Sequence, residues 1–175
     1  MLFIDQSNDI EYIIKSWHQG ENDRYDFNDG INKVEIKSTS KNDRIHRFSL
    51  LQLQEIKDTS VIIGSTFTVE TGKGISVNDL IESIKGKITD HSLMLKIHNT
   101  VANTMRDDFD HIFDIYFDYS LALNSILYFD VRSIPKIHSE DVPNQITNVK
   151  YDCNLSKLDA IDQNKITSQL LKALF

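Results

Sequence analysis

The fold of this chain is decided by residues 25–39, whose sequence is YDFNDGINKVEIKST. The pair Asp29-Gly30 is a strong short-range turn signal, and it separates a short alternation of apolar and polar residues from the segment 33–39. Two strands joined by such a turn form a hairpin. The sequence therefore predicts an antiparallel pair, with residues 25–28 as its first strand and residues 33–39 as its second.

Charged side chains are expected on one face of this hairpin. Successive side chains of a strand point to opposite faces, so Glu35 and Lys37 share one side while Val34 and Ile36 face an apolar side. Asp26, on the first strand, is then expected beside Glu35. The hairpin is predicted to bring two carboxylates and one ammonium into a small space.

Two adjacent carboxylates and a lysine suit the hydrolysis of a phosphodiester. A hard cation such as Mg²⁺ relieves the repulsion between the carboxylates and takes their oxygens as ligands. The cation supplies a nucleophile and neutralises charge on the phosphoryl oxygens, while the lysine orients the attacking water. Because Mg²⁺ takes one or two protein carboxylates, we expect Asp26, Glu35 and the carbonyl of Ile36 to bind Mg²⁺ or Mn²⁺, with Lys37 assisting catalysis.

Helical and strand patterns surround the hairpin and predict the α/β class. Helices are expected over residues 10–18, 49–52, 76–88, 94–105 and 156–174, and strands over residues 44–48, 61–69, 128–131 and 149–155. The segment Gly72-Lys73-Gly74 is expected to form a turn, and residues 135–148 a long surface loop.

Composition and charge narrow the class of protein. The 175 residues, 40% of them hydrophobic, fit one globular domain spanning residues 1–175. A formal charge of −7 argues against a protein that coats nucleic acid by electrostatics alone, but a carboxylate-centred nuclease needs negative charge at its centre. No apolar run long enough to span a bilayer and no secretory signal is present, so a cytoplasmic protein without membrane partners is expected. The single cysteine, Cys153, is expected to be buried.

A basic stretch follows the hairpin. Lys41, Arg44 and Arg47 are the residues expected to contact the phosphates of a nucleic acid, although charges of this kind also serve to solvate a loop. Gln52 fits a capping-box pattern at the start of a helix, which explains it without any role at the site. Gln52 and Glu11 are retained as accessory candidates.

The arrangement resembles the PD-(D/E)XK superfamily, whose restriction-endonuclease-like members carry an Asp, a spacer and then Glu-x-Lys on the next strand. Asp26, the nine-residue step to Glu35, and Lys37 match that pattern. The chain also resembles a bacterial family of PD-(D/E)XK motif proteins found among restriction and phage-defence genes, on the strings SWH at 16–18, DF at 26–27, VEIKST at 34–39, HRFSL at 46–50, QL at 52–53, YFDVR at 128–132, IP at 134–135 and VKYD at 149–152. The chain departs from the family pattern in two ways. Tyr25 stands where the superfamily name has a Pro. The family also has a longer N-terminal region with a helical Glu that can join the metal ligands, and Glu11 is the candidate to replace that Glu in this chain.

The resemblance implies a restriction-endonuclease-like fold, a mixed β-sheet flanked by helices, and Mg²⁺-dependent endonuclease activity on DNA in restriction or phage defence. It also implies DNA and other subunits of a defence system as partners, and a homodimer is compatible with cutting two strands. One alternative is a catalytically silent subunit that keeps the nuclease fold as a DNA-binding or protein-interaction module. Another is a truncated protein that lacks an essential helix.

Overall fold

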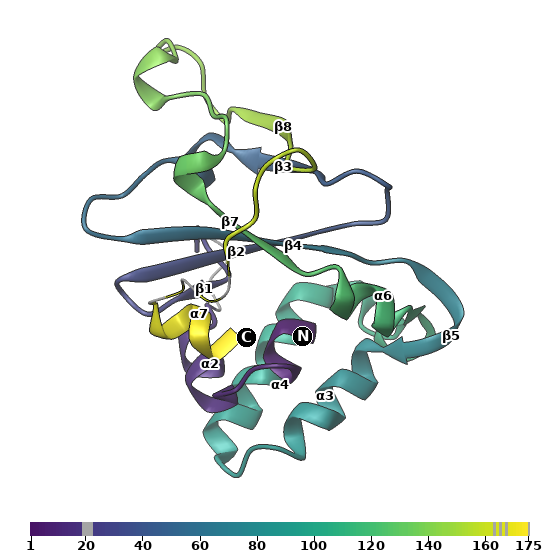
Figure 1. Ribbon diagram of the computed structural model, residues 1–175. Coiled ribbons are helices and arrows are strands. Elements are labelled where there is room, and N and C mark those ends of the chain that lie inside the picture. The colour runs from purple at the N-terminus through teal and green to yellow at the C-terminus, as the bar shows by residue number, and fades with distance from the viewer. Residues whose placement is uncertain (19–22, 163, 165, 167, 175) are drawn as a thin grey trace.

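A central β-sheet carries helices on one face and a two-stranded ribbon on the other (Figure 1). The computed structural model describes residues 1–18, 23–162, 164, 166 and 168–174. The expected α/β class is confirmed, as is the expected mixed sheet flanked by helices. The hairpin of residues 25–39 lies in this central sheet.

The central sheet has the strand order β1-β2-β4-β7. Strands β1 (Phe27–Asn28) and β2 (Asn32–Thr39) are antiparallel, β4 (Ser60–Phe67) runs parallel to β2, and β7 (Leu127–Asp130) runs antiparallel to β4. The sheet is therefore mixed, and β2, which bears the Glu-x-Lys motif, is an inner strand.

The predicted turn between β1 and β2 is present and is fixed by a side chain. Gly30 has a φ of 99°, which glycine adopts at little cost. The carboxylate of Asp29 accepts hydrogen bonds from the backbone N–H groups of Ile31 at 3.0 Å and Asn32 at 2.6 Å, and from the hydroxyl of Tyr12 at 2.7 Å. These bonds hold the register in which Phe27 pairs with Val34, so Asp26 comes next to Glu35.

The helical layer covers one face of the sheet with the larger hydrophobic core. Side chains such as Ile13, Ile84 and Ile97 are fully buried there. Asp9 caps one helix by accepting from Tyr12 N–H. The helices are α1 (Leu2–Asp5), α2 (Ile10–Ser16), α3 (Val77–Lys85), α4 (His91–Met105), α5 (His111–Asp114), α6 (Tyr119–Asn124) and α7 (Gln169–Leu174). Across the described part of the chain, no helix is both long and apolar enough to cross a membrane.

A second core lies on the opposite face of the sheet, under the ribbon of β3 (Ile45–Ser49) and β8 (Lys150–Asn154). Phe48 and Phe129 are fully buried in it, and Cys153 is buried as expected. The segment expected as a strand over 44–48 is thus a strand, but it packs over the central sheet and pairs with β8. The short helix η1 (Leu50–Leu53) follows it.

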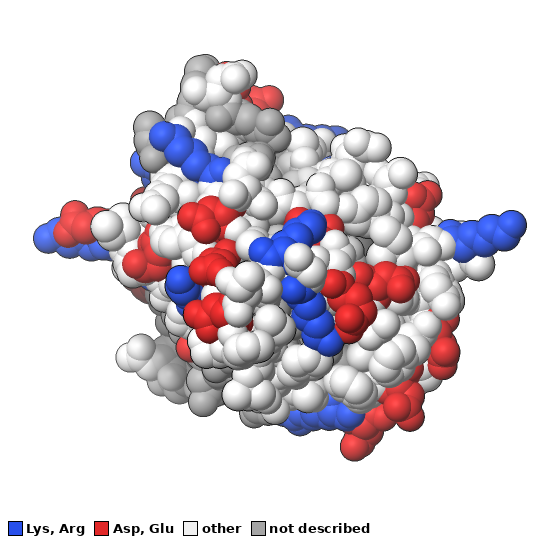
Figure 2. Space-filling model, turned by 90° about the horizontal axis from the view of Figure 1, so that it is seen from below, with Lys and Arg blue, Asp and Glu red and all other residues white. Residues whose placement is uncertain are grey.

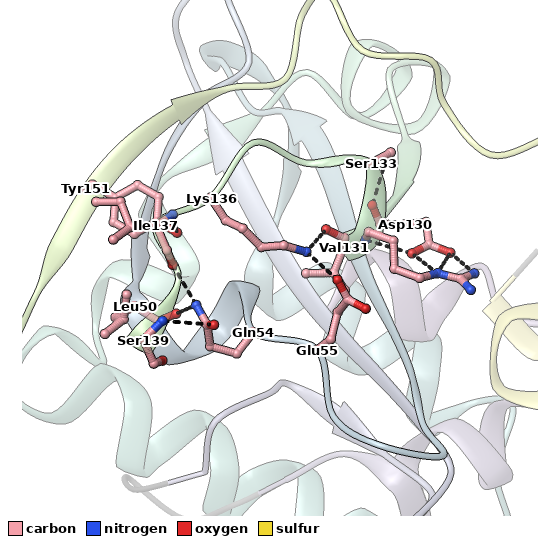
Figure 3. A network of polar contacts seen from close by, with 11 residues as sticks. Leu50, Gln54, Glu55, Asp130, Val131, Ser133, Lys136, Ile137, Ser139 and Tyr151 are labelled. Atoms are coloured by element: carbon pink, nitrogen blue, oxygen red, sulfur yellow. Dashed lines mark hydrogen bonds and ion pairs between the residues drawn. The ribbon is translucent and has the colours of Figure 1, made fainter. Parts of the chain in front are cut away.

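The expected surface loop over residues 135–148 is present and contains the short helix η4 (Ser139–Asp141). Its base is tied to η1 by the side chain of Gln54, which donates to the carbonyl of Ile137 at 2.8 Å (Figure 3). The backbone N–H of Ile137 also donates to the hydroxyl of Tyr151 at 3.3 Å, and Lys136 pairs with Glu55 at 3.0 Å. This loop is therefore anchored to the segment that follows β3.

The expected turn at Gly72-Lys73-Gly74 is wrong. These residues lie inside β5 (Glu70–Ser76), which pairs antiparallel with β6 (Tyr116–Phe117) through an irregular register. A Cβ atom at Gly74 would lie 2.1 Å from the carbonyl oxygen of Phe117. This glycine therefore permits a close backbone approach, which is the second common use of glycine in a strand.

The expected terminal helix does not begin at Ser156, because residues 156–162 are not helical and α7 begins at Gln169. The hydroxyl of Ser156 accepts from the backbone N–H of Arg44 at 2.8 Å, and the backbone N–H of Ile161 donates to the carbonyl of Tyr128 at 2.8 Å. Ser156 and Ile161 therefore bond to distant parts of the chain, and the N–H of Ile161 finds there the acceptor that a helix would have supplied locally.

Candidate active site

Asp26 lies immediately before β1, against the edge of β2. The backbone pairing of β1 with β2 ends at Phe27 and Val34. Beyond this pair, the carboxylate of Asp26 accepts a hydrogen bond from the backbone N–H of Ile36 at 2.6 Å. Burial raises the pKa of Asp26, while the Ile36 N–H and the charge of Lys37 oppose that rise. Asp26 is thus a partly buried carboxylate fixed beside the Glu-x-Lys motif.

Glu35 is a buried carboxylate, with 6% of its surface exposed. Its Oε1 accepts from Lys37 Nζ at 2.6 Å and from Gln52 Nε2 at 2.6 Å. Burial raises the pKa of Glu35 to about 7, and repulsion from Asp26 adds to the rise although Lys37 opposes it. Two carboxylates therefore repel each other at a site shielded from water.

Lys37 connects this carboxylate to the surface. Its side chain is 21% exposed, and Nζ lies 5.5 Å from the centroid of the Phe48 ring while it contacts Glu35. Asp26 lies close enough to Lys37 for their charges to interact. The structure therefore brings Asp26, Glu35 and Lys37 together on and beside β2.

Gln52 has two roles in the structure. Its carbonyl oxygen accepts from the backbone N–H of Ser49 at 3.0 Å, which is the capping-box contact expected from the sequence. Its amide nitrogen donates to Glu35 at 2.6 Å. Capping accounts for only one end of this side chain, and the other end fixes a carboxylate of the site.

The donor set suits a hard divalent cation. Within the described ranges, no group of three or more His, Cys, Asp or Glu side chains is arranged to hold a metal. Mg²⁺, however, usually takes one or two carboxylates and keeps several waters. Since the N–H and C=O of one strand residue point to the same side, the carbonyl of Ile36 faces the edge where Asp26 lies. Asp26, Glu35 and this carbonyl are therefore oxygen donors of the right kind, and a cation would relieve the repulsion between the carboxylates.

Arg44 does not lie on the surface where a phosphate contact was expected. It is 7% exposed, and its Nη1 donates to the carbonyl of Ser65 at 2.9 Å and to the hydroxyl of Ser65 at 2.8 Å, while Nη2 donates to the carbonyl of Ser125. Arg44, His46 and Phe48 alternate with exposed residues and point toward the sheet. Arg44 is therefore a buried structural cation, and the expectation for it is corrected.

Lys41 and Arg47 are exposed, in contrast to Arg44. Arg47 forms a two-bond ion pair with Asp152 across the ribbon, at 2.8 and 3.1 Å. Glu11 lies on α2 and pairs with Lys15 at 3.6 Å, one turn along the same helix. Among the described contacts, none joins Glu11 to the carboxylates of the site, so the structure does not place it there.

Two further residues, His46 and Tyr25, lie beside the site but were not among the site residues expected from the sequence. His46 is 3% exposed, its Nε2 lies 2.8 Å from the hydroxyl of Ser65, and Ser65 is the β4 partner of Lys37. Burial, and then the charges of Lys37 and Arg44, lower the pKa of His46 to about 4, so this ring is neutral at pH 7. Tyr25 is 4% exposed, and its hydroxyl has no hydrogen-bond partner in the part of the chain described. The alternation of residues 44–48 was the signal that could have indicated the burial of His46.

A family model described as "Putative PD-(D/E)XK family member, (DUF4420)" matches residues 1–156. The chain belongs to this family. The resemblance noted in the sequence is thereby confirmed, and the four-stranded mixed sheet with its helices is consistent with the PD-(D/E)XK fold. No curated protein and no solved structure matches the chain. PD-(D/E)XK proteins typically use a divalent metal, which agrees with the oxygen donors of Asp26, Glu35 and Ile36.

Proposed function

We propose that this chain is a metal-dependent DNA phosphodiesterase, an endonuclease-like hydrolase that acts in bacterial restriction or phage defence. The observation that supports it best is the buried carboxylate of Glu35, which is repelled by Asp26 and held by Lys37 and Gln52. Strongly perturbed carboxylates of this kind concentrate at functional sites. Membership of a PD-(D/E)XK family points to the same chemistry.

Each residue of the site has a role in this proposal. Mg²⁺ or Mn²⁺ held by Asp26, Glu35 and the Ile36 carbonyl would supply an activated water and neutralise charge on the phosphoryl oxygens. Lys37 orients the attacking water and stabilises the negative charge that develops as the phosphodiester is cleaved. Gln52 fixes the orientation of the Glu35 carboxylate through its 2.6 Å hydrogen bond, as groups that support metal ligands do.

DNA is the proposed substrate and partner. Lys41 and Arg47 are the exposed cations proposed to contact its phosphates, and Arg47 would exchange its ion pair with Asp152 for a phosphate oxygen. For a role in defence, other subunits of a restriction system and a second copy of the chain are further proposed partners.

The test is a cleavage assay with matched lysine variants. The purified chain is incubated with double-stranded or single-stranded DNA in Mg²⁺ or Mn²⁺, and cleavage is expected in the wild type and absent in Lys37→Ala. Lys33→Ala is the control, because Lys33 lies on the same strand, is not part of the site, and its Nζ donates to the carbonyl of Gly30 at 3.0 Å in the turn. Equal activity in both variants would contradict the role of Lys37.

A second candidate function is a catalytically silent nuclease-fold subunit that binds DNA or another protein. It is favoured by one observation: Glu35 is already bound to Lys37 and Gln52, and no third acidic ligand joins the pair among the described residues. DNA binding by the wild type without any cleavage in Mg²⁺ or Mn²⁺ would support this function and refute the first.

A further inference from the structure

Two glutamines in and after the short helix η1 connect the carboxylate of Glu35 to the loop of residues 135–148. Gln52 donates from its amide nitrogen to Glu35 Oε1 at 2.6 Å. Gln54, two residues further along the chain, donates from its amide nitrogen to the carbonyl of Ile137 at 2.8 Å (Figure 3). Contacts that begin at the site therefore continue through η1 to the base of a loop that is distant in the sequence.

These contacts lie on the side of the sheet that the ribbon covers. Val34 is buried in the helix-side core, so Glu35, the next residue of β2, faces the other side, where Leu53 of η1 is buried. The loop projects from the molecule on this side, beyond the ribbon (Figure 1). The surface of the helical layer, on which acidic and basic side chains are interspersed (Figure 2), lies away from these contacts.

The position of η1 depends on bonds from Gln54. The helix has four residues, and the i→i+3 bonds of a 3₁₀ helix have poorer geometry than those of an α-helix. Leu53 is fully buried, and the backbone N–H of Leu50 donates to the carbonyl of Val149 at 2.9 Å. The amide nitrogen of Gln54 donates to the carbonyl of Leu50 at 3.0 Å, and its oxygen accepts from the backbone N–H of Ser139 at 3.4 Å. One side chain thus closes η1 and ties it to the loop.

The base of the loop gives Gln54 partners that are themselves held in place. The backbone N–H of Ile137 donates to the hydroxyl of Tyr151 on β8 at 3.3 Å. The side chain of Lys136 is 7% exposed, and its Nζ donates to the carbonyl of Val131 at 2.9 Å, at the end of β7. The carbonyl of Ile137 that Gln54 uses is therefore anchored to two strands.

We infer that Gln54 is a positioning residue for Glu35 and acts through Gln52. The oxygen of Gln52 accepts from the backbone N–H of Ser49 at 3.0 Å, so a rotation of η1 carries the whole Gln52 side chain with it. Because hydrogen bonds weaken steeply with poor alignment, such a rotation would release the Glu35 carboxylate. By holding η1 on the base of the loop, Gln54 keeps the amide of Gln52 at this carboxylate. Only the role of Glu35 as a metal ligand rests on the proposed function.

Gln54→Met tests this role, because methionine has a similar length and volume and makes none of the three bonds. In calorimetric titrations of the full chain with Mn²⁺, the affinity should fall about five- to tenfold, since the orientation of a metal ligand is lost. Tyr151→Phe is the matched control: it removes a bond from the same loop base, leaves Gln54 in place, and should bind Mn²⁺ like the wild type. Unchanged affinity in Gln54→Met, or an equal fall in both variants, would refute the role of Gln54.

A second measurement needs no metal. Urea unfolding in EDTA of the wild type, Gln52→Ala, Gln54→Met and the double variant forms a double-mutant cycle. If Gln54 acts through Gln52, the change in unfolding equilibrium constant in the double variant should differ at least about fivefold from the product of the single changes. The cycle of Gln52→Ala with Tyr151→Phe should show no such deviation. Independent effects of Gln52→Ala and Gln54→Met would overturn the inference.

The outcome for Gln54 is separable from the outcome for the nuclease. Coupling between Gln52 and Gln54 in EDTA, without Mn²⁺ binding or cleavage by the wild type, would retain the positioning of Glu35 and refute the metal-dependent phosphodiesterase. Mn²⁺-dependent cleavage by the wild type, with independent effects of Gln52→Ala and Gln54→Met, would retain the phosphodiesterase and refute the role of Gln54.

Discussion

Replacing Glu35 with Gln is expected to stabilise the metal-free protein at neutral and alkaline pH while abolishing cleavage. Glu35 is buried, and its charged form is opposed by burial and by Asp26. The amide of a glutamine has the same shape, and its oxygen still accepts from Lys37 and Gln52. The variant therefore removes a penalised charge and keeps the contacts of Oε1.

The magnitude follows from the pKa of Glu35, which rises from its ordinary value of 4.5 to about 7 in the folded protein. A group whose pKa is raised on folding binds more protons in the folded state, so its ionisation destabilises the fold as pH rises from 4.5 to 7. Each tenfold change in proton affinity corresponds to about 1.4 kcal/mol, which gives a penalty of about 1 kcal/mol at pH 5 and about 3 kcal/mol at pH 8. Relative to wild type, Glu35→Gln should gain this amount.

The assay is urea unfolding of wild type and Glu35→Gln in EDTA at pH 5 and pH 8. The difference between their free energies of unfolding should grow by about 2 kcal/mol over that range, because groups common to both proteins cancel. Adding Mn²⁺ at pH 8 should stabilise only the wild type. A variant less stable than wild type at pH 8, or a difference independent of pH, would refute the argument that Glu35 is held as a penalised carboxylate.

Three further predictions concern the neighbours of the site and the fold. Gln52→Ala should lower Mn²⁺ affinity about 10- to 100-fold in calorimetric titrations, since it removes a bond that orients a ligand, and unchanged affinity would contradict that role. Arg44→Met should lower the free energy of unfolding by about 2–4 kcal/mol and leave the salt dependence of DNA binding unchanged. Lys41→Ala should instead reduce the slope of log affinity against log salt by about 1. A reduced slope in Arg44→Met with an unchanged slope in Lys41→Ala would show that Arg44 contacts DNA. Gly74→Ala should destabilise by about 1–3 kcal/mol, whereas Gly72→Ala, whose Cβ would meet nothing within 4 Å, should change stability by less than about 1 kcal/mol in the same urea assay.

The elements that the sequence predicted well depend on local signals. The turn at Asp29-Gly30 and the capped start of α3 at Ser76 are determined by residues within a few positions of each other. The same locality explains the placement of Glu35 and Lys37, because alternation along one strand and one tight turn suffice to bring them near Asp26. Family resemblance then indicated the chemistry that this arrangement serves.

The elements that the sequence did not predict depend on distant partners. Gly74 suits a turn or a close backbone approach equally well, and the carbonyl of Phe117 decides between them. Ser156 has the chemistry of a helix cap, but the backbone of Arg44 takes its hydroxyl. A basic residue in a polar stretch is usually solvated. Arg44 is nevertheless buried, because the carbonyl and hydroxyl of Ser65 and the carbonyl of Ser125 accept hydrogen bonds from its guanidinium.

The most direct test of the metal site is a Mn²⁺ titration followed by electron paramagnetic resonance on four proteins: wild type, Asp26→Asn, Glu35→Gln and Lys37→Ala. If the two carboxylates form one cation site, wild type should bind Mn²⁺ saturably and each carboxylate variant should lose that binding. Lys37→Ala should retain it, because removing the ammonium at 2.6 Å removes a competitor for Glu35. Equal Mn²⁺ binding by wild type and both carboxylate variants would contradict the existence of this site.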